Sequence, residues 1–183
     1  MDPLPFDELN KLIATLPAYV DEKTGKLKDR DSLLDMLEDF FLLAYANGVE
    51  STNLSLGSDY SASLETVMDT VDKEIQGKNW RQRVREYYDN GGTVADIARI
   101  AETEAHRDAN AGAYAAAVAG GATVKVWNTM LDDRVRDTHQ WLEGVQAPID
   151  GVFFNEYGAS TRYPGEWGIP EEDVNCRCFL TYA

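Results

Sequence analysis

The segment DDRVRDTHQWLEG, residues 132–144, combines acidic, basic and imidazole side chains within a short stretch. The only cysteines of the chain, Cys176 and Cys178, stand in the sequence NCRC close to its last residue. Thiolate, imidazole and carboxylate groups are the side chains that bind zinc in proteins. His139, Cys176 and Cys178 are therefore candidate zinc ligands with Asp133 as the candidate fourth, although Cys-x-Cys is a tighter spacing than most zinc sites use.

Two other interpretations use the same kinds of side chain. In a catalytic site, Glu104, Asp132 or His139 would act as the acid or base, and a cysteine would be the nucleophile. In a buried polar network, such groups would fix neighbouring elements through hydrogen bonds and ion pairs. The sequence matches no catalytic signature, so it favours the network, predicts that the chain is not an enzyme, and indicates no small-molecule substrate.

Two helices must position these residues, and the first is predicted over residues 94–118. On a helical wheel Glu104 falls inside the apolar arc of this helix, where an unpaired carboxylate would be costly. Arg107 lies one turn further along and is the expected partner of Glu104. His106 points away from the arc, so the sequence predicts that it faces solvent.

The second, shorter helix is predicted over residues 133–142, capped by Asp132 or Asp133 and ended by Gly144. Its polar residues border an apolar side, as they do on the longer helix. If the two helices pack with these polar seams in contact, the seams form one network. The predicted network comprises Thr103, Glu104, Arg107, Asn110, Asp132, Arg136 and His139.

The predicted fold class is α+β, a helical N-terminal half followed by a small α+β domain with a short antiparallel sheet. Residues 1–92 form the helical region and residues 93–183 the second domain, because the segment DNGGT ends one helix. Thr93 with Asp96 then resembles a capping box for the next helix. A strand is predicted over residues 123–131, and the short runs GVQAP, GVFFN and CRCFLTY are expected to complete the sheet.

The strongest helix of the first half is predicted to begin at a cap formed by Asp31 or Ser32. It carries a broad apolar face, which either packs on the second half of the chain or docks on a partner. That face comprises Leu33, Leu34, Leu37, Phe40, Phe41 and Ala44. Residues 51–63 are predicted to be a loop, because small polar residues and glycine dominate them.

The formal net charge of the chain is −15 at pH 7. Phosphate neutralisation by basic side chains supplies most non-specific nucleic-acid affinity, so this charge disfavours contact with DNA. An acidic surface suits a basic protein partner instead. No apolar run approaches the roughly 20 residues of a membrane span, and the first residues lack a signal sequence, so the product is expected in the cytoplasm without membrane association.

Three segments, AETEAHRDANAGAY, WNTMLDDRVRDTHQWLEGV and YPGEWGIPEEDVNCRC, occur in this order. Together they resemble the C-terminal domain of phage head-morphogenesis proteins, the minor head proteins of the phage Mu F type. The resemblance covers residues 93–183, and residues 1–92 resemble less distinctly the helical region that precedes this domain. The family pattern falls on Thr103, Glu104, Arg107, Asn110, Trp127, Asp132, Arg134, Arg136, His139, Gly144, Pro164, Cys176, Arg177 and Cys178.

The resemblance implies a virion component in the capsid interior or portal region, made in the host cytoplasm. Such proteins enter the procapsid in few copies, associate with the portal and other head proteins, and are implicated in head assembly and in DNA packaging or ejection. Residues 1–92 would then be a portal-docking or packing arm. Related domains also occur joined to toxin or ADP-ribosyltransferase domains. The alternative function is a small cytosolic metal-dependent hydrolase or a toxin-associated domain that uses the His139, Cys176 and Cys178 cluster.

Overall fold

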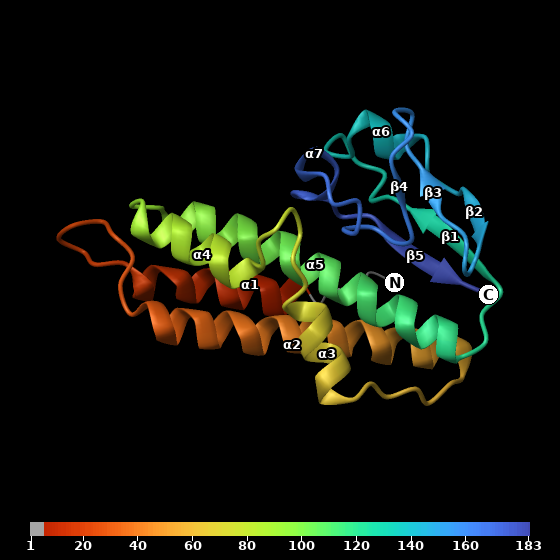
Figure 1. Ribbon diagram of the computed structural model, residues 1–183, viewed down its shortest axis with the longest axis horizontal. Coiled ribbons are helices and arrows are strands. Elements are labelled where there is room, and N and C mark those ends of the chain that lie inside the picture. Colours follow the sequence, from red (N-terminus) through yellow and green to blue (C-terminus); the bar gives the residue numbers. More distant parts are fainter. Residues whose placement is uncertain (1–5) are drawn as a thin grey trace.

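The computed structural model describes residues 6–183, with side chains from residue 9 onward. A long helical body carries a small unit of short strands and helices over one end (Figure 1). The helices are α1 (Phe6–Thr15), the 3-10 helix η1 (Leu16–Tyr19), α2 (Arg30–Leu56), α3 (Leu64–Val71), α4 (Trp80–Asp89), α5 (Val94–Ala119), α6 (Asp137–Gln140) and α7 (Pro170–Asp173). The strands are β1 (Val124–Asn128), β2 (Gln146–Pro148), β3 (Phe153–Phe154), β4 (Ser160–Thr161) and β5 (Phe179–Tyr182). The predicted α+β class is confirmed.

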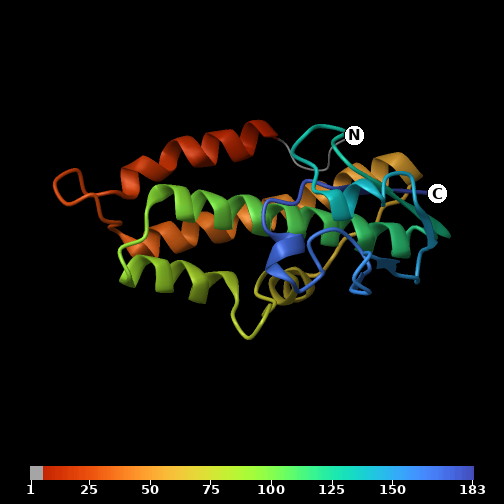
Figure 2. The same cartoon turned by 90° about the horizontal axis from the view of Figure 1, so that it is seen from above.

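The helical body is built around the parallel pair α2 and α5, which run in the same direction and pack along most of their length (Figure 1). Seen from above, α1 and α4 lie on opposite sides of this pair (Figure 2). All six residues of the apolar face predicted on α2 are buried in the core, as are Ile97, Ile100 and Ala101 of α5. That face therefore packs against a helix from the second half of the chain. Of the two predicted alternatives, packing within the chain and docking on a partner, the first is the one observed.

The bounds of α2 differ from the prediction at both ends. Its N-cap position is Asp29, whose φ of 54° is left-handed, rather than Asp31 or Ser32. At the other end, α2 runs on to Leu56 before Gly57 ends it in the left-handed conformation, so the predicted loop over residues 51–63 is wrong in its first part. Packing of the last turns against α5 outweighs the weak helix propensity of the small polar residues there.

The start of α5 follows the prediction. The Thr93 hydroxyl accepts a hydrogen bond from the backbone N–H of Asp96, and the Asp96 carboxylate accepts from the Thr93 N–H at 2.9 Å. This capping box satisfies two of the amides that a helix leaves unpaired at its first turn. α5 then runs for 26 residues and reaches from the helical body to the strand unit.

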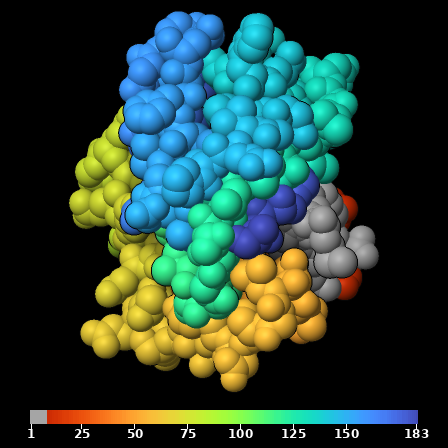
Figure 3. All heavy atoms as spheres, turned by 90° about the vertical axis from the view of Figure 1, so that its right-hand side faces the viewer, coloured from red at the N-terminus to blue at the C-terminus, as the bar shows by residue number. Residues whose placement is uncertain are grey.

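In the strand unit β1 is the central strand of a three-stranded antiparallel sheet, with β2 on one side and β5 on the other. Trp127 pairs with Leu180 across β1 and β5, and both side chains are buried. β3 and β4 form a separate antiparallel hairpin. In the end-on view the last residues of the chain lie between the strand unit and the end of α2 (Figure 3). The predicted short antiparallel sheet is confirmed, except that the GVFFN segment belongs to the separate hairpin.

The predicted helix over residues 133–142 is mostly absent, because only Asp137–Gln140 forms α6. The N-cap position is Arg136 rather than Asp132 or Asp133. Asp132 instead accepts a hydrogen bond from the Arg134 amide at 3.1 Å, a local side-chain bond that favours a turn over a helix. The chain thus reaches His139 through a turn.

Candidate functional site

Three side chains with metal-ligand chemistry meet beneath the sheet. His139 comes from α6, while Cys176 and Cys178 precede β5. The His139 Nδ1 atom lies 3.6 Å from the Cys176 sulfur and 3.4 Å from the Cys178 sulfur. The three ligand atoms lie within 4.8 Å of one another, and all three residues are buried. This arrangement could hold a metal ion, which agrees with the predicted trio of ligands.

Aromatic rings enclose the imidazole. Trp167 stacks on it, with ring centroids 5.8 Å apart and planes inclined by 20°. Trp127 meets it edge-on at 5.5 Å. The Asp173 carboxylate accepts hydrogen bonds from the amides of Trp167 at 3.0 Å and Gly168 at 2.8 Å, which holds the segment that carries Trp167 in place. The rings thereby fix the plane of His139.

A buried carboxylate occupies the other side of the imidazole. Glu172 of α7 places Oε2 at 3.0 Å from His139 Nε2. The Thr138 hydroxyl donates to the same oxygen at 2.8 Å, and the Asn155 amide donates to Oε1 at 2.8 Å. Asp133, the predicted fourth ligand, is instead exposed on the turn before α6 and lies outside the ligand group. Its backbone belongs to a turn, so the helical register that motivated its choice does not exist.

The two thiols differ in acidity. Their mutual hydrogen bond raises the pKa of Cys176 and lowers that of Cys178, and burial raises both. Cys178 is therefore the thiol that loses its proton more readily.

A second cluster is centred on Glu104, which is buried and pairs with an arginine as predicted. Glu104 forms ion pairs with Arg83 of α4 and with Arg107, the latter at 2.6 Å. Arg107 also donates to the fully buried Asp108 at 2.8 Å. Burial raises the pKa of Asp108 to about 7, although the charge of Arg107 opposes that rise. The cluster ties α4 to α5 inside the helical body.

A third cluster joins α5 to the segment before β5. The Asn110 amide donates to the Cys178 carbonyl at 3.1 Å, and His106 Nε2 lies 2.5 Å from the same oxygen. His106 is 4% exposed, so the prediction that it faces solvent is wrong. The Thr103 hydroxyl accepts from the Asn175 amide at 3.3 Å in the same region. The strand unit packs over this part of α5 and covers its otherwise polar side.

The remaining residues of the predicted network form separate contacts. Asp132 pairs with Arg177 through two hydrogen bonds of 2.6 Å and 2.8 Å. Arg136 donates to the carbonyls of Glu171 and Val174, each at 2.6 Å. The polar residues of α5 and those of the 132–139 segment therefore belong to several clusters. The predicted meeting of two helical seams is wrong, because the second helix is too short to carry a seam.

Sequence reasoning missed several buried polar residues. Lys125 is fully buried in β1, and its ammonium group donates to the carbonyls of Gly151 at 2.6 Å and Arg162 at 2.9 Å. Desolvation lowers the pKa of Lys125 to about 8. The alternation of β1 gave a usable signal, because Lys125 shares its face with Trp127. For Glu172 there was no such signal in the sequence. It is one of three consecutive acids that make up most of α7, and nothing in the sequence distinguishes it from the other two.

Three hollows differ in what they could admit. One of about 10 Å³ borders His139, Cys176 and Cys178 together. A larger one of about 730 Å³ borders Cys176, with the arginines Arg134, Arg136 and Arg177 among its lining residues. The ligand group as a whole thus faces a space the size of a single water.

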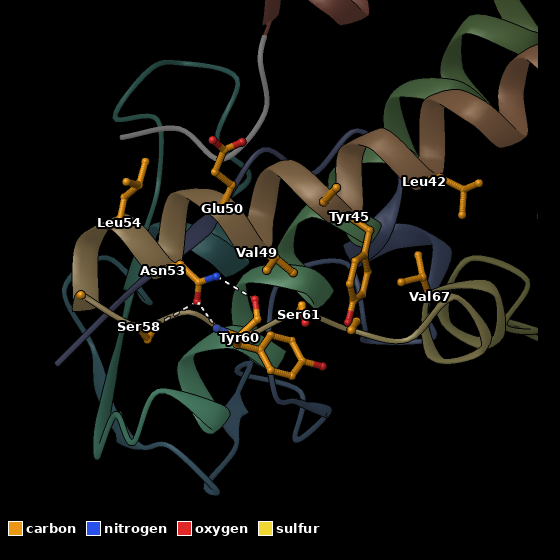
Figure 4. A pocket seen from close by; sticks show the side chains of 13 residues that line it. Leu42, Tyr45, Val49, Glu50, Asn53, Leu54, Ser58, Tyr60, Ser61 and Val67 are labelled. Carbon is orange, nitrogen blue, oxygen red and sulfur yellow. Dashed lines mark hydrogen bonds between the residues drawn. The ribbon is translucent and has the colours of Figure 1, made fainter.

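The third hollow, of about 600 Å³, lies between the last turns of α2 and the segment that leads to α3 (Figure 4). Asn53 holds that segment in place, because its side chain donates to the Tyr60 carbonyl at 2.8 Å and accepts from the Tyr60 amide at 3.2 Å. Tyr45, Val49 and Val67 line the hollow, which is therefore largely apolar.

Within residues 6–183, no helix has the length and apolar character needed to cross a membrane.

The fold is thus an α+β arrangement with a buried histidine and two cysteines, and sequence comparison shows the family of the chain. Residues 64–181 match the family described as "Phage Mu protein F like protein", and the chain belongs to this family. The matched region begins at α3, ahead of the boundary predicted at residues 92 and 93, and the division into two domains stays a prediction.

Two curated relatives are similar to parts of the chain. The minor head protein GP7 of Bacillus phage SPP1 is 38% identical over 94 residues, which are 50% of this chain and 30% of GP7. The NAD(+)--arginine ADP-ribosyltransferase EFV of Enterococcus faecalis is 30% identical over 146 residues, which are 61% of this chain and 30% of that enzyme. The chain thus spans about a third of the length of each relative. No solved structure matches the chain.

Proposed function

We propose that this chain is a phage minor head protein that takes part in head morphogenesis through contacts with other head proteins. The observation that carries the proposal is its membership of the Phage Mu F-like family, together with 38% identity to a minor head protein over 94 residues. As the resemblance implies, the chain would enter the procapsid in few copies and associate with the portal. Its place would be the capsid interior or the portal region, after synthesis in the host cytoplasm.

The charge of the chain favours a protein partner over nucleic acid. At a net charge of −15, its surface repels phosphate and attracts a basic protein face. Any role in DNA packaging or ejection would then run through the portal rather than through direct contact with DNA. The apolar face of α2 is already buried in the core, so it is not available to dock on a partner.

We propose that the chain works by its shape and is not an enzyme. A hydrolase that used the ligand group would need room for a substrate, and the hollow that borders all three ligands measures about 10 Å³. Of the three, only Cys176 borders the larger hollow beside it. The transferase activity of the Enterococcus relative belongs to a protein of which this chain spans 30%.

We also propose zinc as the ion that the His139, Cys176 and Cys178 group would hold, in a structural role. Thiolate and imidazole ligands select zinc over the harder cations magnesium and calcium. Two thiolates, a neutral imidazole and Zn²⁺ sum to zero charge, which suits a buried position. Such an ion would join α6 to the segment before β5 and so stabilise the strand unit.

Co-expression with the portal protein of the same genome tests the head-protein proposal. We expect the chain to co-elute with a tagged portal assembly in size-exclusion chromatography at moderate salt, whereas the chain alone elutes separately. Failure to co-elute with portal or procapsid would contradict the proposal. If the chain instead bound DNA tightly, with an affinity that falls steeply as salt rises, a direct DNA-handling role would replace it.

A further inference from the structure

The contact between Glu172 and His139 bears on which ring nitrogen of His139 is free to bind a metal ion. A neutral imidazole carries hydrogen on one ring nitrogen and a lone pair on the other. The Glu172 carboxylate lies 3.0 Å from Nε2 without the alignment of a hydrogen bond, and its negative charge favours the tautomer with hydrogen on Nε2. The lone pair of Nδ1 then points at the two sulfurs.

Without a cation the two thiols use Nδ1 unequally, because one can donate to it and the other is left with the hydrogen bond between the thiols. Nδ1 offers a single lone pair, yet the sulfurs of Cys176 and Cys178 both lie within 3.6 Å of it. Only one thiol can donate to that lone pair. A cation at the centre of the three atoms would bind all of them, because each offers a lone pair once the thiols have lost their protons.

Glu172 is itself held in place by neutral donors. Its two carboxylate oxygens accept hydrogen bonds from Thr138 at 2.8 Å and Asn155 at 2.8 Å. Glu172 is 5% exposed, and its ion-pair contact is with His139. A buried carboxylate with this set of partners is costly unless it supports something else. Metal-binding histidines commonly rest on such a carboxylate.

We propose that Glu172 is the positioning residue of a zinc site formed by His139, Cys176 and Cys178, with a water molecule from the adjoining hollow of about 10 Å³ as the fourth ligand. The inference rests on the proposal that zinc is the bound ion, and it is independent of any association with the portal. Glu172 sets the tautomer and ring direction of His139, while Trp167 and Trp127 restrict the plane of the ring. The three ligands would contact the ion, and Glu172 and the two tryptophans would hold His139 in place behind them.

The test compares Glu172→Gln with Glu171→Gln, since Glu171 is the adjacent acid of α7 and is exposed. The full chain is purified without added metal, and zinc is measured by elemental analysis. Affinity is then measured by competition with a chromophoric chelator. We expect close to one zinc per wild-type chain, an affinity weakened about 10–100-fold in Glu172→Gln, and no change in Glu171→Gln.

A measurement on the wild-type chain tests the zinc site even if the Glu172→Gln variant fails to fold. Replacement of zinc by Co²⁺ should give the intense visible bands of a tetrahedral site and a thiolate charge-transfer band in the near ultraviolet. Less than a tenth of an equivalent of zinc, with no uptake of added Zn²⁺ or Co²⁺, would overturn the zinc site. Full zinc binding with equal affinities in Glu172→Gln and wild type would overturn the positioning role of Glu172 alone.

Discussion

Gly48 of α2 lies so close to Ala109 of α5 that a Cβ atom on Gly48 would overlap the Ala109 carbonyl oxygen and come within 2.9 Å of the Ala113 amide nitrogen. The relationship is reciprocal, because a Cβ on Gly112 of α5 would overlap the Tyr45 carbonyl oxygen of α2. The two glycines therefore set how closely the two long helices approach. The packing of α5 against α2, the most extensive contact between helices in the body, depends on that approach.

Gly48→Ala should destabilise the protein despite the better helix propensity of alanine. Relief of the clash requires α2 and α5 to separate, and overpacking of this kind costs about 1–3 kcal/mol or more, against about 1 kcal/mol gained from propensity. The free energy of unfolding from urea titration measures the effect. Ala46→Ser, on the exposed face of the same helix, is the control and should change little. A Gly48→Ala variant as stable as wild type would show that the helices can separate freely.

Glu104→Ala should lower the free energy of unfolding by about 3–5 kcal/mol, because it removes one of the two ion pairs that buried Arg107 forms among the described residues. Thermal and urea denaturation both report this loss. Glu50→Ala removes an exposed acid from α2 and serves as the control. If the two variants lost similar amounts, the Glu104 pair would contribute no more than a surface charge.

Asp132→Ala should cost only about 0–1 kcal/mol, because its ion pair with Arg177 is partly exposed. The effects of Asp132→Ala and Glu104→Ala should also add within about 0.5 kcal/mol in the double variant, since the two residues share no partner. Urea titration of the four proteins of this double-mutant cycle measures the coupling. A coupling energy above about 1 kcal/mol would place both residues in one network after all.

The stability of the protein should rise with pH across the range in which Lys125 titrates. Its folded-state pKa is about 8, below the ordinary value of 10.5, so between these values the unfolded chain binds more protons than the folded one. The free energy of unfolding contributed by this group therefore increases from pH 8 to pH 10.5 and is constant below that range. Lys125→Met should lack this rise, whereas Lys26→Met, at an exposed lysine, should retain it. Identical pH profiles for wild type and Lys125→Met would contradict the assignment.

Local chemistry in the sequence was enough to determine several features. Helical periodicity predicted the apolar face of α2 and placed Glu104 against the core, because both depend on a regular turn within one helix. The capping box of Thr93 and Asp96 is a contact between residues three apart, so it can be recognised without tertiary information. The scarcity of cysteine and histidine likewise singled out His139, Cys176 and Cys178 as potential ligands.

Tertiary structure alone decided which other side chains join these groups. Asp133 and Glu172 are both acids near a ligand in the sequence, yet only Glu172 reaches His139, because α7 and α6 meet through packing around Trp167. His106 is buried because the chain returns 72 residues later to place the Cys178 carbonyl beside it. Long-range contacts of this kind leave no periodic trace in the sequence, since their energy depends on segments that meet only when the chain folds.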